Sequence, residues 1–209
     1  MPKTENAQRL ENVARSIGGT LLESRTFQRV GSTFRREAEP GFVHIIDFGL
    51  GQSWSMYAGQ FTVDICAFIG EAYDLFFSTP IPRRPTATHC ELRMRLGMLR
   101  TPPADQWWLL SAKSLSAEVG GEITRLGLPF LERIASRRAL VDAWIASGND
   151  SLGLPPRGDL VVAAMLVKLG DRAGARKVLS SALETAAGQR YEAFYDDVAR
   201  RILAQQQSA

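Results

Sequence analysis

The sequence predicts an α+β protein with an N-terminal helix, a four-stranded, mainly antiparallel sheet backed by helices, and a C-terminal helical hairpin plus one helix. Two patterns support this prediction. Over residues 57–69 apolar residues alternate with polar ones, which is the period of a strand. Near the N-terminus and beyond residue 158 they recur three and four positions apart, which is typical of amphipathic helices. The 209 residues, 45% hydrophobic and 22% charged, have an ordinary globular composition.

The first elements are a helix and a hairpin. Apolar residues share one helical face over residues 10–17, and the Gly18-Gly19 pair is expected to end the helix. The turn Pro40-Gly41 then joins strands over residues 33–39 and 42–50.

Two further strands complete the predicted sheet. The alternation over residues 57–69 places Thr62, Asp64 and Cys66 on a face that we expect to be wetter than the other. A second alternating stretch, residues 89–96, predicts the fourth strand. Short turns between consecutive strands favour antiparallel pairing.

The middle of the chain is expected to contain a surface excursion and two helices. Three prolines lie within residues 70–87, which we therefore predict to contain no regular strand or helix. Helical spacing over residues 115–126 is followed by Gly127, expected as a C-terminal cap. Pro129 is suited to begin the next helix, residues 130–145, in which Ser136 could mark a break.

Composition divides the chain into three parts. Residues 1–148 form the predicted α+β domain, residues 149–158, rich in Gly, Asn, Ser and Pro, form a linker, and residues 159–209 form a helical segment that could pack on the same core. In that segment Gly170 is expected to end one helix and Asp171 to cap the next.

Charge and cysteine content point to an ordinary cytoplasmic protein. The net charge of +3 is spread along the chain, so it gives little indication of a nucleic-acid or membrane partner. No apolar run is long enough to span a bilayer, and Cys66 and Cys90 are not preceded by a secretory signal pattern. We therefore expect a cytoplasmic location, reduced thiols and no membrane association.

No residue pattern predicts catalysis, a cofactor or a metal. Consecutive residues of a strand point to opposite faces, so of His89, Cys90 and Glu91 at most two could bind one ion. The glycines near residue 50 lack the Lys-Ser or Lys-Thr of a phosphate-binding loop. Asp47 and Asp64 could face each other across paired strands, but only two histidines, His44 and His89, are available as bases.

Binding is the better supported class of function, and two features suggest where. Residues 83–100 contain Arg83, Arg84, Arg93, Arg95 and Arg100 against the single acid Glu91, a bias suited to phosphates or to an acidic protein surface. The adjacent Trp107 and Trp108 cannot both face one core, so one is expected to be buried and the other to be available as a binding hot spot.

Residues 7–145 resemble a bacterial family of uncharacterised proteins, the domain-of-unknown-function family 4304. The motifs that match are Phe27 to Arg36, Ile45-Ile46-Asp47-Phe48, Phe61-Thr62-Val63-Asp64-Ile65, Arg95-Leu96-Gly97, Asp105-Gln106-Trp107-Trp108 and Gly127-Leu128-Pro129. The chain departs from the family at Asp64, where asparagine is more common, and in a longer link before Arg95. The resemblance implies an α+β domain whose relatives are suspected of being toxin-immunity or other binding proteins.

Three functions are therefore expected in order. The first is a non-enzymatic domain that binds a protein partner and could form a homo-oligomer. The second is nucleic-acid binding through the Arg83–Arg100 region, although aromatic residues are not interleaved with these arginines. The third is a hydrolase of unknown substrate that uses Asp47 or Asp64 with a histidine.

Overall fold

In the part of the chain that the structure describes, the sheet has six strands, all paired antiparallel. The structure, a computed structural model, describes residues 4–52, 54–77 and 79–205. The strand order is β1-β2-β3-β4-β5, with β6 also paired to β4. The strands are β1 (Gln28–Val30), β2 (Thr33–Glu39), β3 (Phe42–Leu50), β4 (Gln60–Ile69), β5 (Leu92–Arg95) and β6 (Trp108–Leu109). The predicted α+β class is confirmed, and β2 to β5 overlap the four predicted strands. Two of the predicted bounds are wrong: β4 begins at Gln60 rather than at residue 57, and β5 is shorter than residues 89–96, because His89 belongs to η1 and residues 90–91 only connect η1 to β5.

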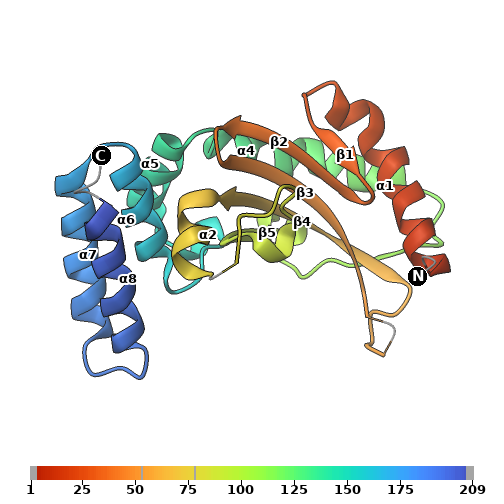
Figure 1. Cartoon of the computed structure of the whole chain (residues 1–209). Helices are drawn as coiled ribbons and strands as arrows, with labels where there is room; N and C mark the ends of the chain where they lie inside the picture. Colours follow the sequence, from red (N-terminus) through yellow and green to blue (C-terminus); the bar gives the residue numbers. More distant parts are fainter. Residues whose placement is uncertain (1–3, 53, 78, 206–209) are drawn as a thin grey trace.

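Helices cover one face of the sheet and continue beyond one end of it. The α-helices are α1 (Glu5–Glu23), α2 (Gly70–Phe76), α3 (Leu115–Glu122), α4 (Leu128–Arg133), α5 (Arg137–Ser147), α6 (Gly158–Lys168), α7 (Arg172–Ala186) and α8 (Glu192–Gln205). Short 3₁₀ segments are η1 (Ala87–His89), η2 (Leu96–Leu99) and η4 (Asp150–Leu152), and η3 (Ile123–Gly127) is a π-helical turn. Figure 1 shows α1 near one end of the sheet and α6 to α8 at the other. No described helix is long and apolar enough to cross a membrane.

The predicted end of the first helix is wrong, because α1 continues through Gly18 and Gly19 to Glu23. Gly18 is needed for close packing instead. A Cβ at Gly18 would lie 2.3 Å from Cζ of Phe34, a fully buried ring of β2. The glycine therefore allows α1 to lie directly on the sheet.

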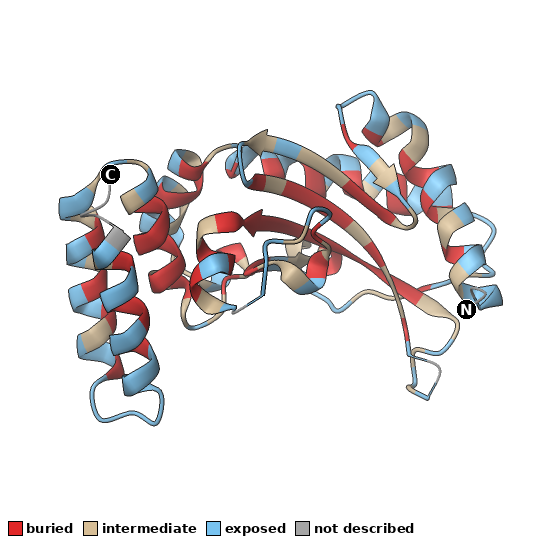
Figure 2. Cartoon of the chain, viewed as in Figure 1, coloured by how far each residue is buried: buried red, intermediate tan, exposed pale blue. Residues whose placement is uncertain are grey.

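The predicted wet face of β4 is also wrong. Thr62, Asp64 and Cys66 are all buried, as are the residues of the opposite face (Figure 2). The chain that follows α2 covers this second face: Ala87 and Cys90 pack in one cluster with Ile45, Cys66 and Phe68. Alternation in sequence shows which residues share a face, but it does not show whether a distant segment covers that face.

Two expectations for the middle of the chain need correction. Residues 70–76 form the helix α2, whose Ala72 and Leu75 are buried, so the irregular excursion begins only at Phe77. Gly127 does not end a helix, because η3 runs directly into α4 and the backbone of Gly127 is itself helical. A Cβ at Gly127 would lie 3.0 Å from Cδ1 of Ile65, so this glycine too serves close packing on the sheet.

The segment around residues 149–158 and helix α6 pack against the main core. Leu152 and Leu154 are buried in it, together with the side chains of Val161, Val162, Met165 and Leu166 on α6. Helices α7 and α8 pack on the other side of α6 in a second apolar cluster that includes Leu75 of α2. Asp171 caps α7 as predicted, since its carboxylate accepts a hydrogen bond from the backbone N–H of Gly174.

One buried cation ties the β2–β3 turn to the helices. Arg137, at the start of α5, forms ion pairs with Glu39 of β2 (2.9 Å) and Glu71 of α2 (2.6 Å). It also donates to the carbonyl of Pro40. Its side chain is only 6% exposed, so these partners compensate a desolvated charge.

Gly18 and Gly19 give a matched test of this packing. We expect Gly18→Ala to reduce the free energy of unfolding by about 1–3 kcal/mol, because the added methyl would overlap the fixed ring of Phe34. Gly19→Ala should increase it by roughly 0.5–1 kcal/mol, since no heavy atom lies within 4 Å of that Cβ and alanine favours a helix. Urea denaturation of both variants measures the difference. Equal effects would contradict the assigned role of Gly18.

Candidate functional site: an arginine-lined cleft

Three of the five predicted binding arginines are paired within the molecule. Arg93 of β5 pairs with Asp64 at 2.7 Å, Arg95 pairs with Asp105 at 2.6 Å, and Arg100 pairs with Glu122. These partners lie outside residues 83–100, so the local excess of positive charge is largely neutralised in the fold. The stripe predicted from sequence is therefore not a continuous cationic surface.

Glu91, the one acid within that stripe, is buried rather than solvated. It forms a bidentate ion pair with Arg157, with N–O distances of 2.9 and 3.1 Å. This pair joins the start of β5 to the start of α6.

Trp107 and Trp108 have different environments, as their adjacency predicts. Trp108 is buried in the core, and its indole N–H donates to Glu118 at 2.8 Å. Trp107 is partly exposed and stacks on Tyr57 with ring centroids 4.2 Å apart. The guanidinium of Arg95 lies 5.2 Å from the Trp107 ring. A role for either tryptophan in binding stays a prediction.

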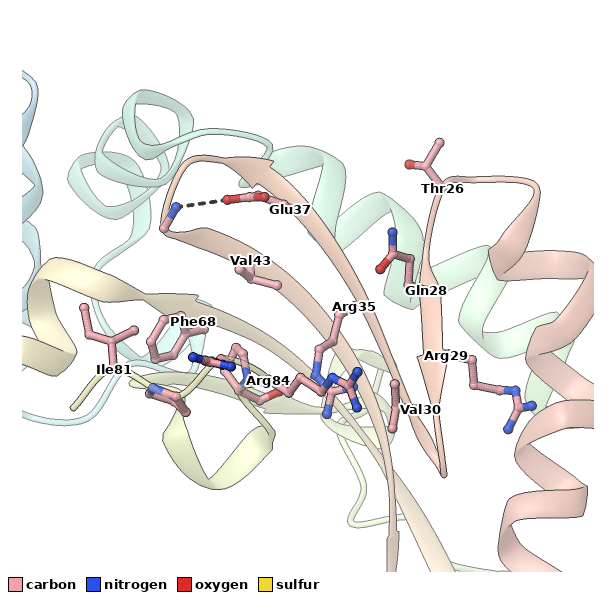
Figure 3. A pocket seen from close by; sticks show the side chains of 14 residues that line it. Thr26, Gln28, Arg29, Val30, Arg35, Glu37, Val43, Phe68, Ile81 and Arg84 are labelled. Atoms are coloured by element: carbon pink, nitrogen blue, oxygen red, sulfur yellow. Dashed lines mark hydrogen bonds between the residues drawn. The ribbon is translucent and has the colours of Figure 1, made fainter. Parts of the chain in front are cut away.

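Arg83 and Arg84 lie elsewhere, at a cleft of about 470 Å³ on the second face of the sheet. The floor is formed by β1, β2 and β3, and one wall is formed by residues 81–85 (Figure 3). We call it the arginine cleft. It is lined by Thr26, Gln28, Arg29, Val30, Arg35, Glu37, Gly41, Val43, Phe68, Ile81, Pro82, Arg83, Arg84 and Pro85.

Arg35 is the central charge of the arginine cleft. It stands on β2, opposite Gln28 of β1 and Ile45 of β3, and its Nε donates to the carbonyl of Pro85. Its Nη1 is buried and has no hydrogen-bond partner among the described residues. Burial lowers the pKa of Arg35, and the positive charge of Arg84 lowers it further, whereas Asp47 acts in the opposite direction.

The other residues that line the arginine cleft balance the positive charge of Arg35 only in part. Glu37 is the one carboxylate among the lining residues, and it accepts a hydrogen bond from the backbone N–H of Gly41. Among the described residues Arg83 and Arg84 have no ion pair, and both are exposed. Arg29 contributes little charge here, because its side chain points away from the cleft toward α1 (Figure 3). Such a concave cationic surface is suited to bind an anionic group.

The candidate catalytic residues are not brought together. Asp47 and Asp64 do face each other across β3 and β4. Asp47 accepts from the hydroxyl of Thr33 at 2.7 Å, and Asp64 accepts from Arg93. His44 lies on the opposite face of the sheet, where its Nε2 donates to the carbonyl of Ile134 at 3.0 Å.

His89 and the cysteines also have local partners. The Nδ1 of His89 bonds to the hydroxyl of Thr86 at 2.8 Å. Cys66 and Cys90 are both free thiols, and burial raises the pKa of Cys66. Within residues 4–52, 54–77 and 79–205, no three or more His, Cys, Asp or Glu side chains are grouped as metal ligands.

The family model for a domain of unknown function, DUF4304, matches residues 19–133, which is more than half of the chain. The chain belongs to the DUF4304 family. The matched residues include all six strands and the complete arginine cleft, whereas α5 to α8 lie outside the DUF4304 match. No match was found among curated proteins or among solved structures.

Arg35 is not identifiable as a site residue from the sequence alone, although the fold of this DUF4304 chain places it close to Arg84. The available signal was the alternation along β2, which puts Thr33, Arg35 and Glu37 on one face. This alternation does not identify the face as a site, because Arg35 and Arg84 are about fifty positions apart in the chain. The wall that joins them, residues 81–85, follows no regular period.

The buried His44 predicts a specific pH dependence of stability. Burial lowers its pKa from 6.5 to about 4, and the nearby Arg36, which donates to Nδ1, adds to this effect. The native state therefore holds His44 neutral at pH values where the unfolded chain binds a proton. Stability from this residue is complete above pH 6.5 and is lost as the pH falls toward 4.

We expect roughly 2–3 kcal/mol of unfolding free energy to be lost through His44 between about pH 7 and pH 4.5. In His44→Gln the amide can still donate to Ile134 but does not titrate, so the pH dependence should be flatter by this amount. Urea denaturation of both proteins at the two pH values provides the comparison. Parallel losses in wild type and variant would show that His44 is not responsible.

Proposed function

We propose that this DUF4304 protein is a binding domain whose arginine cleft holds an acidic segment of a partner protein. The observation that supports the proposal most directly is Arg35, a half-buried cation whose Nη1 has no hydrogen-bond partner within the described chain. A carboxylate in the cleft would accept from this group and offset its repulsion with Arg84.

The lining of the cleft favours a peptide over a nucleic acid. Apolar side chains, among them Val30, Ile81 and Phe68, line the cleft together with the arginines. Val30 and Ile81 are 45% and 51% exposed, an apolar surface that a peptide side chain can cover. Nucleic-acid binding usually uses exposed aromatic platforms along a basic groove, and none of the residues lining this cleft is an exposed aromatic ring.

The setting that we expect for this interaction is the bacterial cytoplasm, without a cofactor or a catalytic step. A toxin-immunity protein would be one binding domain of this kind. The product of a neighbouring gene, tested in purified form, is therefore the first natural partner to examine.

Charge reversal at Arg83 and Arg84 tests the proposal. A fluorescently labelled peptide in which glutamate alternates with valine should bind the wild-type protein, and the anisotropy signal should fall with rising salt. We expect Arg83→Glu combined with Arg84→Glu to weaken binding by about tenfold or more, because two cations at the cleft become anions. Both side chains are exposed, so the fold should be retained.

The matched control is Arg172→Glu combined with Arg176→Glu, which changes the net charge equally at exposed positions on α7. This control should bind the peptide with nearly the wild-type affinity. Equal weakening in both double variants would show that the change in net charge alone explains the loss of peptide binding, and this would contradict the proposal. If the peptide fails to bind but a single-stranded oligonucleotide binds with a steep salt dependence, and only the cleft variant loses that binding, the function is nucleic-acid binding.

A further inference from the structure

A second pocket, of about 320 Å³, lies on the same face of the sheet and shares no lining residue with the arginine cleft. Strands β3, β4 and β5 and the residues after β3 supply its walls. It is lined by Gly49, Leu50, Gly51, Gln52, Ser55, Tyr57, Thr62, Asp64, Arg93, Arg95 and Trp107. We call it the Asp64 pocket.

Asp64 contributes a buried acceptor that is not satisfied. The residue is only 2% exposed. Its Oδ2 accepts from Nη2 of Arg93 at 2.7 Å, whereas its Oδ1 is buried with no hydrogen-bond partner among the described residues. An unpaired carboxylate oxygen in such a place is costly, and a cationic donor bound in the pocket would remove that cost.

The arginines of the same pocket retain donors for an anionic group. Arg93 uses Nη2 toward Asp64, and its side chain is still 44% exposed. Arg95 uses Nη1 toward both oxygens of Asp105, and its side chain is 36% exposed. A guanidinium carries five N–H donors, so each arginine has N–H groups left for a ligand.

The walls of the Asp64 pocket are held in place. Trp107 stacks on Tyr57 at an interplanar angle of 10°, and its indole N–H donates to Asp105, the partner of Arg95. Gly51 is packed so closely that a Cβ there would lie 2.1 Å from the carbonyl oxygen of Tyr57. Gly49 adds no side chain on the pocket side of β3. A preorganised site of this kind loses little entropy when a ligand binds.

The geometry points to a small zwitterion as the ligand of the Asp64 pocket, with its ammonium group bound by Asp64 and its carboxylate bound by Arg93 and Arg95. The two arginines are balanced by Asp64 and Asp105, so the site is close to neutral and matches a ligand without net charge. The volume suits a molecule of the size of a free α-amino acid.

A thermal-shift screen of the full chain against the individual free α-amino acids tests this inference. A ligand at about ten times its Kd should raise Tm by about 3–5 °C. The N-acetyl and methyl-ester derivatives of the best amino acid each lack one charge and should produce little or no shift. No shift above about 1 °C with any amino acid at about 20 mM would overturn the inference.

Gly49→Val distinguishes this pocket from other sites. A Cβ at Gly49 would lie 3.9 Å from Oδ2 of Asp64 and from Cγ2 of Thr62, an ordinary contact, so valine can be accommodated while its methyls fill the pocket. Its Tm shift with the amino acid should be abolished. The control Gly121→Val, on α3 with no atom within 4 Å of the new Cβ, should keep the full shift.

Asp64→Asn provides a second variant, because the neutral amide cannot balance an ammonium group. In Asp64→Asn, at least a tenfold higher amino-acid concentration should be needed to give the same Tm shift. This variant tests the inference even if Gly49→Val does not fold. A shift that survives both variants, or one that is lost in Arg83→Glu combined with Arg84→Glu, would place the amino acid elsewhere and overturn the inference. Failure of peptide binding at the arginine cleft leaves this result unaffected, since the two sites share no lining residue.

Discussion

The burial of β4 on both faces determines how the remaining chain must pack. Between Phe61 and Ile69 every residue of this strand is buried, which requires one layer of helices on one side and a second covering layer on the other. On the side of β4 that faces the helices the buried residues are apolar, so apolar packing alone is enough to cover them. The other side carries Thr62 and Asp64, so its covering layer must also supply hydrogen-bonding partners.

Those partners come from segments distant in the sequence. Arg93 of β5 pairs with Asp64, and the carbonyl of Gln106 accepts from the hydroxyl of Thr62 at 3.1 Å. On β3 the carboxylate of Asp47 accepts from the backbone N–H of Ala87 in η1. The largely irregular chain between α2 and α3, which includes the short strands β5 and β6, is thus held to the sheet by polar contacts as well as by the small apolar cluster around Cys66. This explains how a proline-rich segment can be ordered over a sheet without a regular period of its own.

Hydrophobic periodicity predicts the parts of this fold that repeat regularly along the chain. Four strands, the presence of the first helix and the Asp171 cap of α7 follow from residues that are neighbours along the chain. The two glycines misjudged as helix ends, Gly18 and Gly127, show where that reasoning fails. Glycine ends a helix when its backbone adopts a positive φ, but it also occurs inside a helix that must approach a sheet closely, and only the tertiary packing distinguishes the two cases.

The same limit applies to the candidate sites. Arginine far outnumbers lysine in this chain, and its planar, forked guanidinium suits bidentate pairing with carboxylates. Arg137, Arg157 and Arg100 each use it to join elements far apart in sequence. A local count of charges therefore could not separate arginines that form ion pairs within the fold from arginines that remain available to bind a partner. The carboxylates that pair with the structural arginines lie up to about a hundred residues away in the chain. Once those pairs are formed, Arg83 and Arg84 differ from the other arginines of the predicted stripe, and the half-buried Arg35 beside them gives the cleft a charge that its own lining does not neutralise.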